Sequence, residues 1–217
     1  MFFLSKILKP VILWFFCMFI DLTLPINEKI PVFPGNPIPE ITQIASIDEK
    51  GWNEKRLTFN SHFSTHIDAP RHMLEKGKTL SEYSIESFIG KAIVFDVRGE
   101  SVIDVDVDSI KSNDIVFFYT GYSSHIYESD YFENNPVISK DTIEQLIKKK
   151  ISILGIDSFT PDNEPYSLHK KLFHHDIRIV ENLIHLDLIP KKRFFCYIFP
   201  LNIEDADGAP CRVVAQV

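Results

Sequence analysis

Four short runs of β-branched and aromatic residues constrain the fold of this chain most strongly. Charged or turn-forming residues end each run, and together the runs predict β-strands over residues 91–97, 114–120, 151–156 and 177–184. Helical patterns separate some of these runs. Strands that alternate with helices predict an α/β domain, and its sheet is expected to be mixed because some strands follow one another without a helix.

The clearest helical pattern covers residues 139–150. Ser139 is a good N-cap residue, acidic residues follow it, and lysines close the segment. Ile143, Leu146 and Ile147 recur at helical spacing, which predicts one buried helical face. A shorter helix is expected over residues 168–175.

A rigid, irregular loop is predicted after the first strand-like segment, residues 19–24. Prolines fix the backbone and lack an N–H donor, so they disfavour a regular ladder. Such loops often line a pocket, and this one contains Pro31, Pro34, Gly35, Pro37 and Pro39.

The size and composition of the chain favour one globular domain and argue against nucleic acid as a partner. The 217 residues include 45% hydrophobic and 24% charged residues and show no internal repeat. A net charge of -7 repels phosphate backbones. The cysteines form no CxxC pair and are expected to be reduced core residues: Cys17, Cys196 and Cys211.

The first eighteen residues form a hydrophobic extension whose role is open. Lys6 and Lys9 precede the apolar run 11–20, as in a signal peptide, but no small-residue cleavage site follows and the run is short for a membrane span. The segment is a packed or interfacial helix, an uncleaved anchor, or an upstream extension of a chain that naturally starts at Met18. The last interpretation is favoured. The expected organisation is therefore a domain over residues 19–217 in a cytoplasmic protein, with membrane association or export as the alternative.

A cluster of metal-ligating side chains lies within residues 57–68. Apolar residues stand at odd positions of this segment and polar ones at even positions, which predicts a half-buried strand with one polar face. That face carries His62, His66 and Asp68. Two imidazoles and one carboxylate suit zinc or manganese, and three protein ligands leave positions open, as catalytic sites do.

The spacing of these ligands requires the strand to bend. Residues four apart on a straight strand lie about 13 Å from each other, near the limit for two histidines that share one ion. The backbone is therefore expected to turn at Ser64 and Thr65. Pro70 then ends the ladder, and His72 follows where it can face the same site.

A second constellation lies downstream. Glu181 shares strand parity with apolar neighbours, and a buried carboxylate needs a partner such as a metal, an arginine or several hydrogen bonds. His169, on the preceding helix, is placed to reach it. A solvated histidine and a salt-bridged glutamate are the equally weighted alternative. The remaining histidines are expected at the surface: His125, His174, His175 and His185.

The run from His62 to His72, HFSTHIDAPRH, resembles the HxxTHxDxPxH signature of the cyclase-like metal-dependent hydrolases, which include bacterial kynurenine formamidase and isatin hydrolase. Segments that agree in order extend the resemblance over residues 19–217: FIDLT at 19–23, PVFPG at 31–35, TGY at 120–122, PLNI at 200–203 and DGAPCR at 207–212. The resemblance implies a swivelling β/β/α domain with a mixed sheet and flanking helices. It also implies a homodimer or homotetramer.

The resemblance assigns a role to each motif residue. His62, His66 and Asp68 would hold one divalent ion, Asp68 would bridge to a second held by His169 and Glu181, and His72 would be the catalytic acid/base. Zn²⁺ is expected ahead of Mn²⁺.

The implied reaction is hydrolysis of an amide C–N bond by a metal-activated water. The expected activity is that of an arylformamidase of tryptophan catabolism, which converts N-formylkynurenine to kynurenine and formate. Phe33 stands where kynurenine formamidases place a substrate-stacking tryptophan, and Ser64 replaces a common glycine. A hydrolase of cyclic amides, imides or lactones is therefore the alternative, and a non-catalytic metal-binding module is a distant one.

Overall fold

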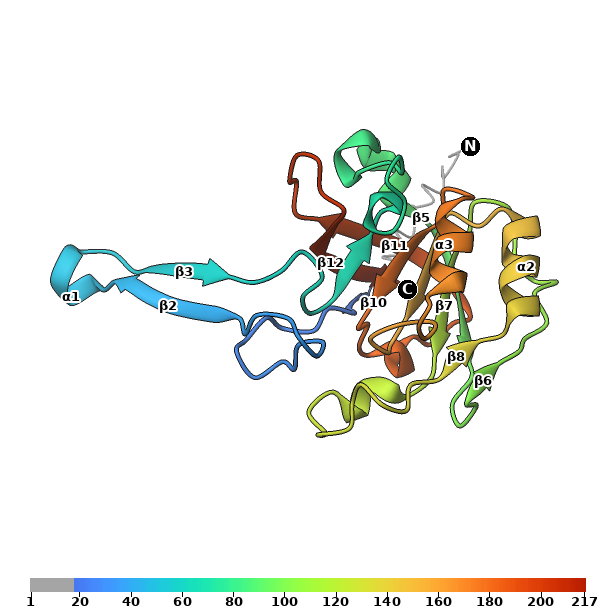
Figure 1. The fold of residues 1–217 in the computed structure, drawn as a ribbon, viewed down its shortest axis with the longest axis horizontal. Coiled ribbons are helices and arrows are strands. Elements are labelled where there is room, and N and C mark those ends of the chain that lie inside the picture. Colours follow the sequence, from blue (N-terminus) through green and yellow to red (C-terminus); the bar gives the residue numbers. More distant parts are fainter. Residues whose placement is uncertain (1–17) are drawn as a thin grey trace, which may run out of the picture.

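A closed, mixed β-sheet forms the body of the protein in the computed structural model (Figure 1). The structure describes residues 18–217, so the expectations for residues 1–17, Cys17 included, lie outside the described part. The strand order is β1-β12-β11-β5-β7-β9-β10-β4, and a further pairing between β12 and β4 closes the sheet. The mixed α/β domain predicted from the sequence is confirmed.

One half of the sheet is parallel. Its strands pair in the order β5, β7, β9 and β10, and each matches a run predicted from the sequence, with ends shifted by a few residues. The hydrophobic runs therefore marked the buried strands correctly. Their bounds are Ile89–Asp96 for β5, Ile115–Tyr119 for β7, Ile153–Ile156 for β9 and Arg178–Glu181 for β10.

The other half of the sheet is antiparallel. The long strand β12 (Gly208–Gln216) pairs with β11 (Arg193–Pro200), with β1 (Phe19–Asp21) near its end and with β4 (His66–Asp68) near its start. The three-residue strand β4 also pairs with β10. Because β4 connects the two halves, its side chains lie where the closed sheet is completed.

Two α-helices cover the parallel strands on one side of the sheet (Figure 1). They are α2 (Lys140–Lys149) and α3 (Ser167–Phe173), close to the predicted positions. The Ser139 hydroxyl accepts a hydrogen bond from the Thr142 N–H at 3.0 Å, as expected of an N-cap. Among the helices of residues 18–217, none has both the length and the apolar character needed to cross a membrane.

Short elements connect these parts. Single-turn 3-10 helices occur at η1 (Pro70–His72), η2 (Leu80–Glu82), η3 (Ile85–Phe88), η4 (Tyr122–His125) and η5 (Leu186–Leu188). The strands β6 (Val102–Ile103) and β8 (Val137–Ile138) form a small parallel pair.

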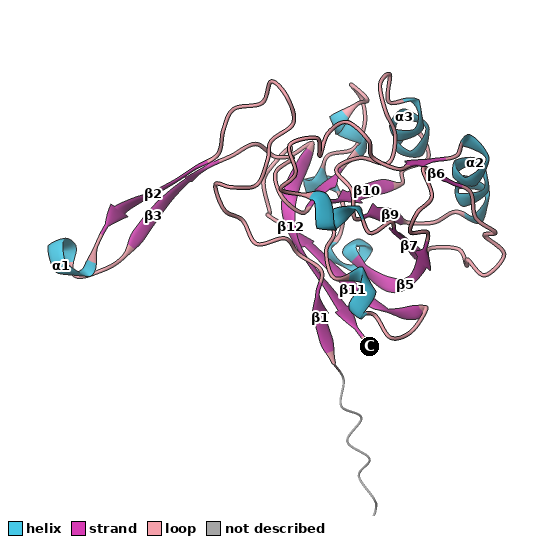
Figure 2. Ribbon diagram, turned by 90° about the horizontal axis from the view of Figure 1, so that it is seen from below, coloured by secondary structure: helices cyan, strands magenta, loops and turns pink. Residues whose placement is uncertain are grey.

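A two-stranded arm projects from the body (Figures 1 and 2). It consists of β2 (Glu40–Ala45), α1 (Ile47–Lys50) and β3 (Glu54–Thr58). This arm overturns the prediction of one half-buried strand over residues 57–68. Leu57 is 55% exposed and pairs with Ile41 in the arm, whereas regular pairing with the body starts only at His66. Alternating polarity indicated extended backbone correctly, but it could not show that the segment changes sheets.

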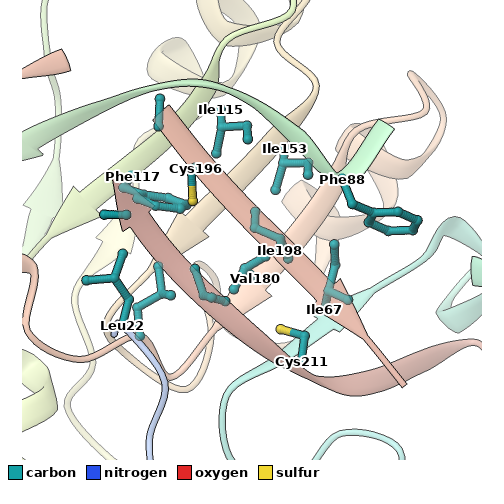
Figure 3. Close-up of a cluster of buried hydrophobic side chains, with 14 of the residues drawn as sticks. Leu22, Ile67, Phe88, Ile115, Phe117, Ile153, Val180, Cys196, Ile198 and Cys211 are labelled. Carbon is teal, nitrogen blue, oxygen red and sulfur yellow. The ribbon is translucent and has the colours of Figure 1, made fainter. Parts of the chain in front are cut away.

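Two main cores pack on the two faces of the sheet. The first lies inside the closed sheet, where Leu22, Ile67, Phe117, Val180 and Ile198 meet (Figure 3). The second lies between the parallel strands and the two helices. The thiols Cys196 and Cys211 are buried and free, as predicted, and burial raises the pKa of both.

Candidate metal centre

Five side chains predicted as metal ligands meet where β4 completes the sheet. His66 and Asp68 come from β4, Glu181 lies opposite His66 on β10, His169 comes from α3, and His62 from the loop before β4. These five residues form two overlapping groups, each with ligand atoms within 4.8 Å of one another, and Asp68 belongs to both; a third such group joins His62 to His72 and Asp207. The structure therefore brings together all five residues that the sequence singled out.

The backbone bends at the position that the spacing required. Ser64 has a left-handed φ of 61°, and its hydroxyl donates to the Leu24 carbonyl at 2.8 Å. Thr65 is fixed beside it, because its hydroxyl donates to the Asn182 carbonyl at 2.6 Å. The ring centroids of His62 and His66 lie 5.2 Å apart as a result. The predicted turn is confirmed, and Pro70 ends the strand as expected.

Hydrogen bonding fixes which nitrogen of His66 points into the cluster. Nδ1 lies 2.9 Å from the Ser64 carbonyl oxygen, which can only accept, so Nδ1 carries the hydrogen. In the neutral ring, Nε2 is then an acceptor that faces Asp68 Oδ1 at 3.3 Å and Glu181 Oε2 at 3.4 Å. Three acceptors that face one another, all on buried residues, require a cation or an added proton between them.

His169 has the same arrangement. Its Nδ1 is hydrogen-bonded to the Asp162 carboxylate, and its Nε2 faces Glu181 Oε1 at 3.2 Å. Both nitrogens therefore face carboxylates, while a neutral imidazole has only one N–H to donate. A cation inside the cluster would again interact favourably with both Nε2 of His169 and the Glu181 carboxylate.

His62 completes the pattern. Its Nδ1 lies 2.7 Å from Asp68 Oδ1, and its Nε2 lies 2.8 Å from Asp207 Oδ2. Each of the three histidines thus has one nitrogen held from outside the cluster and one directed toward Asp68 or Glu181. Imidazole nitrogen with carboxylate oxygen is the donor set that zinc and similar divalent ions prefer, so the residues fit such an ion.

Without a metal, protons take the place of the cation. Burial lowers the pKa of His62, but the carboxylates of Asp68 and Asp207 outweigh it and raise the pKa to about 9. For His169, Asp162 and Glu181 likewise outweigh burial and raise the pKa to about 10. Burial raises the pKa of Asp68, but His62 and His66 hold it well below its usual range. Metal uptake must therefore displace protons from the histidines.

The cluster opens onto a cavity of about 680 Å³. Pro31, Pro37 and Pro39 line one wall, so the predicted proline-rich loop does border a pocket. Seven aromatic side chains also line the cavity: Phe33, Phe59, Phe63, Tyr131, Phe132, Phe159 and Tyr166. Such a cavity suits a flat, mainly apolar molecule whose reactive group reaches the cluster.

His72 lines the same cavity without joining the five-residue cluster. Its ring centroid lies 3.9 Å from that of His62, and its Nδ1 lies 3.6 Å from Asp207 Oδ2. Burial lowers the pKa of His72 below its usual value and outweighs the opposing effect of Asp68. The ring is therefore neutral near pH 7 and able to accept a proton.

Similarity to known proteins shows which family the chain belongs to. The sequence profile of the Cyclase family matches residues 20–163. The kynurenine formamidase of Erythrobacter litoralis is 32% identical over 90% of this chain and 92% of its own length, and that of Bacillus cereus is 31% identical over 91% and 96%. The chain belongs to the Cyclase family.

Solved structures agree with this assignment. A potential metal-dependent hydrolase with cyclase activity is 30% identical and superposes with a TM-score of 0.79, covering 92% of this chain and 98% of that one. Isatin hydrolase A from Ralstonia solanacearum shares the fold at 24% identity, with a TM-score of 0.83 and coverage of 93% and 92%. This Cyclase family member is thus a hydrolase, and its clustered histidines and carboxylates support a divalent metal.

Two residues of this Cyclase family site were not identified from the sequence. Asp207 contacts His62, and Asp162 contacts His169. Both lie in loops far from the histidine motif, so spacing within that motif carries no signal for them, although Asp207 opens the DGAPCR segment on which part of the family resemblance rests. The four histidines expected at the surface are indeed exposed: His125, His174, His175 and His185.

Phe33 lies at the cavity wall, where the resemblance placed a substrate-stacking ring. Its side chain is 44% exposed and meets Phe132 edge-on, with ring centroids 5.6 Å apart. Phe159 also lies near the ring, with centroids 6.4 Å apart, so Phe33 is part of the aromatic lining while a large fraction of its side chain stays accessible.

Proposed function

We propose that this protein is an arylformamidase that hydrolyses the amide C–N bond of N-formylkynurenine to give kynurenine and formate. The observation that carries the proposal is the position of the inward-facing nitrogens and carboxylates at the end of an aromatic cavity. The relatives named kynurenine formamidase, about a third identical over nine tenths of the chain, support it.

Two divalent ions, Zn²⁺ in preference to Mn²⁺, are the proposed cofactors. His62, His66 and Asp68 would hold one of them. Asp68, His169 and Glu181 would hold the other, so that Asp68 is shared. When bound, such ions polarise an amide carbonyl and lower the pKa of water.

His72 is the proposed acid/base. In its neutral form it accepts a proton from the attacking water and then gives it to the nitrogen of the leaving amine. The new C–O bond replaces the broken C–N bond, and the products are a carboxylic acid and an amine. Asp207, 3.6 Å from His72 Nδ1, is placed to orient the ring so that Nε2 faces the cavity.

The aromatic wall is proposed to hold the aryl group of the substrate. Phe33 can stack on the ring but has no N–H to donate to the substrate. A cyclic aromatic amide such as isatin is also flat and needs no such donor at this wall. Hydrolysis of cyclic amides is therefore the second candidate function.

The test is formamidase activity coupled to metal content. The purified protein is expected to contain about two divalent ions per chain, to hydrolyse N-formylkynurenine faster than isatin or aryl esters, and to lose this activity when a chelator removes the ions. Activity that persists without metal would contradict the proposal. Faster turnover of isatin would favour the second candidate.

We further propose that the protein acts as a cytoplasmic homodimer or homotetramer, with residues 19–217 as the hydrolase domain and residues 1–18 as an extension. Support for a dimer comes from the arm, which exposes apolar side chains although an isolated two-stranded hairpin is marginally stable. These side chains belong to Ile47, Trp52 and Leu57. Light scattering coupled to size exclusion measures the mass directly, and a monomeric mass would contradict the proposal.

A further inference from the structure

We propose that Asp162 is a positioning residue that keeps His169 in the one tautomer able to bind metal. The inference rests on the proposed role of His169 as a ligand of the second ion. Among the described residues, the Asp162 carboxylate is hydrogen-bonded to Leu168 and His169 and does not line the cavity, so it acts on the site through His169.

Asp162 is fixed on both sides by the structure around it. It lies in the loop between β9 and α3 and is 4% exposed. One carboxylate oxygen accepts the Leu168 N–H at 2.8 Å, and the other accepts the Nδ1–H of His169. The Thr160 hydroxyl donates to the Asp162 carbonyl at 2.9 Å, which fixes the backbone of the same residue. The carboxylate is therefore held in place before any metal binds.

The position of His169 Nε2 shows why the contact between Asp162 and Nδ1–H matters. Nε2 lies 3.2 Å from Glu181 Oε1, within hydrogen-bonding distance. If the hydrogen of the neutral ring moved to Nε2, His169 would donate it to Glu181, and the two ligands of the second ion would bind each other. A carboxylate at Nδ1 retains the hydrogen there and leaves the Nε2 lone pair free.

The other histidines of the cluster do not depend on a buried carboxylate in this way. The backbone carbonyl of Ser64 holds Nδ1–H of His66, and no side-chain substitution removes it. Asp207, which holds His62, has a side chain that is 42% exposed, so water can replace part of its contact. The side chains of His169 and Asp162 are both almost inaccessible to solvent, so bulk water does not compete for the contact between them.

Metal titration of Asp162→Asn and Asp162→Ala tests the inference. We expect wild-type protein to bind two Zn²⁺ ions, and both variants to keep the first ion while the second binds about 10–100-fold more weakly, because an outer partner of a ligating histidine typically has an effect of this size. Asparagine retains the shape of the side chain but has one acceptor oxygen for two donors, Leu168 N–H and His169 Nδ1–H, so the affinity for the second ion should fall in Asp162→Asn, though less than in Asp162→Ala. Ring ¹⁵N NMR of the metal-free proteins at high pH should show the hydrogen of His169 moving from Nδ1 to Nε2.

The matched control is Asp114→Asn. Asp114 is also a buried acid, 3% exposed, and accepts hydrogen bonds from the Lys111 N–H at 2.7 Å and from Arg193 at 2.8 Å. It lies immediately before β7 and makes no hydrogen bond or ion pair with a residue of the cluster. Its variant should bind both ions with wild-type affinity.

The outcomes separate this inference from the proposed function. Wild-type protein that binds fewer than two ions overturns the proposed metal site itself. Suppose instead that the wild type binds two ions, and that Asp162→Asn keeps both the affinity for the second ion and the His169 tautomer. This result would overturn only the role of Asp162. An equal loss of affinity for the second ion in Asp114→Asn would also overturn the role of Asp162, because the loss would then reflect a general decrease in protein stability. If Asp162→Ala does not fold, Asp162→Asn carries the test.

Discussion

Substitution of Gly208 by alanine should disrupt the first proposed metal position without replacing any of its ligands. Gly208 starts β12 and pairs with Asp68 of β4. A Cβ atom built on it would lie 2.5 Å from Cε1 of His62 and 3.1 Å from both ring nitrogens. Carbon atoms in favourable contact lie about 3.5–4.0 Å apart, so the ring must retreat by about 1 Å.

That displacement is large on the scale of metal coordination. Ligand distances in a metal site vary by only about 0.2 Å, so a ring displaced by about 1 Å no longer binds in the original geometry. The backbone can yield little, because β12 and β4 hold each other in the closed sheet. A misplacement of this size in a catalytic site costs about 100-fold in rate. We expect Gly208→Ala to fold, to bind the first ion more weakly and to lose about 100-fold in kcat/KM.

Elemental analysis after dialysis measures the metal content, kinetics with N-formylkynurenine measure kcat/KM, and thermal unfolding shows whether the variant folds. Gly90→Ala is the matched control, because Gly90 also lies in a strand of the sheet and its Cβ would meet Ile115 Cδ1 at an ordinary 3.6 Å. Wild-type metal content and activity in Gly208→Ala would refute the reasoning, as would equal losses in both variants.

Three further results are expected. His72→Ala should retain its metal but lose about 10²–10⁴-fold in kcat, as for other acid/base residues; loss of the metal would instead make His72 a ligand. Ser139→Ala should lower the free energy of unfolding by about 1 kcal/mol in urea titrations, since its hydroxyl caps α2 through the Thr142 N–H; an unchanged midpoint would contradict this. Because the pKa of His62 is about 9 in the metal-free protein, a proton must leave when metal binds. Metal affinity in chelator competition should therefore fall at least tenfold per unit as pH decreases from 9 to 7, since each protonated histidine ligand must also lose its proton, and a pH-independent affinity would argue against this.

The sequence was most informative where one local pattern decides one local structure. β-branched runs located β5, β7 and β9, and Ser139 marked the start of α2. The bend at Ser64 followed from a distance argument alone, since two histidines four residues apart on a straight strand can scarcely share an ion. Each of these inferences uses interactions within a few residues along the chain.

The remaining features depend on contacts between distant segments. The closure of the sheet needs β12 to pair with both β11 and β4, and no periodicity shows which strands pair. Leu57 has the polarity pattern of a half-buried strand yet lies in the arm, because alternation does not reveal whether another element covers the apolar face. Asp162 and Asp207 reach the histidines only through the tertiary fold, so their roles became visible only with side chains in place.

The arm has a consequence for how this enzyme can diversify. Of the residues in β2, α1 and β3, only Ala45 is buried, so almost none of its side chains is held by the packing that stabilises the body. Substitutions there have small effects on folding and are weakly restrained by selection for stability. The loops at its base nevertheless line the cavity, through Pro39 on one side and Phe59 on the other. Sequence changes at the base of the arm can therefore retune which molecules reach the cluster, while the three-residue strand that carries His66 and Asp68 stays unchanged.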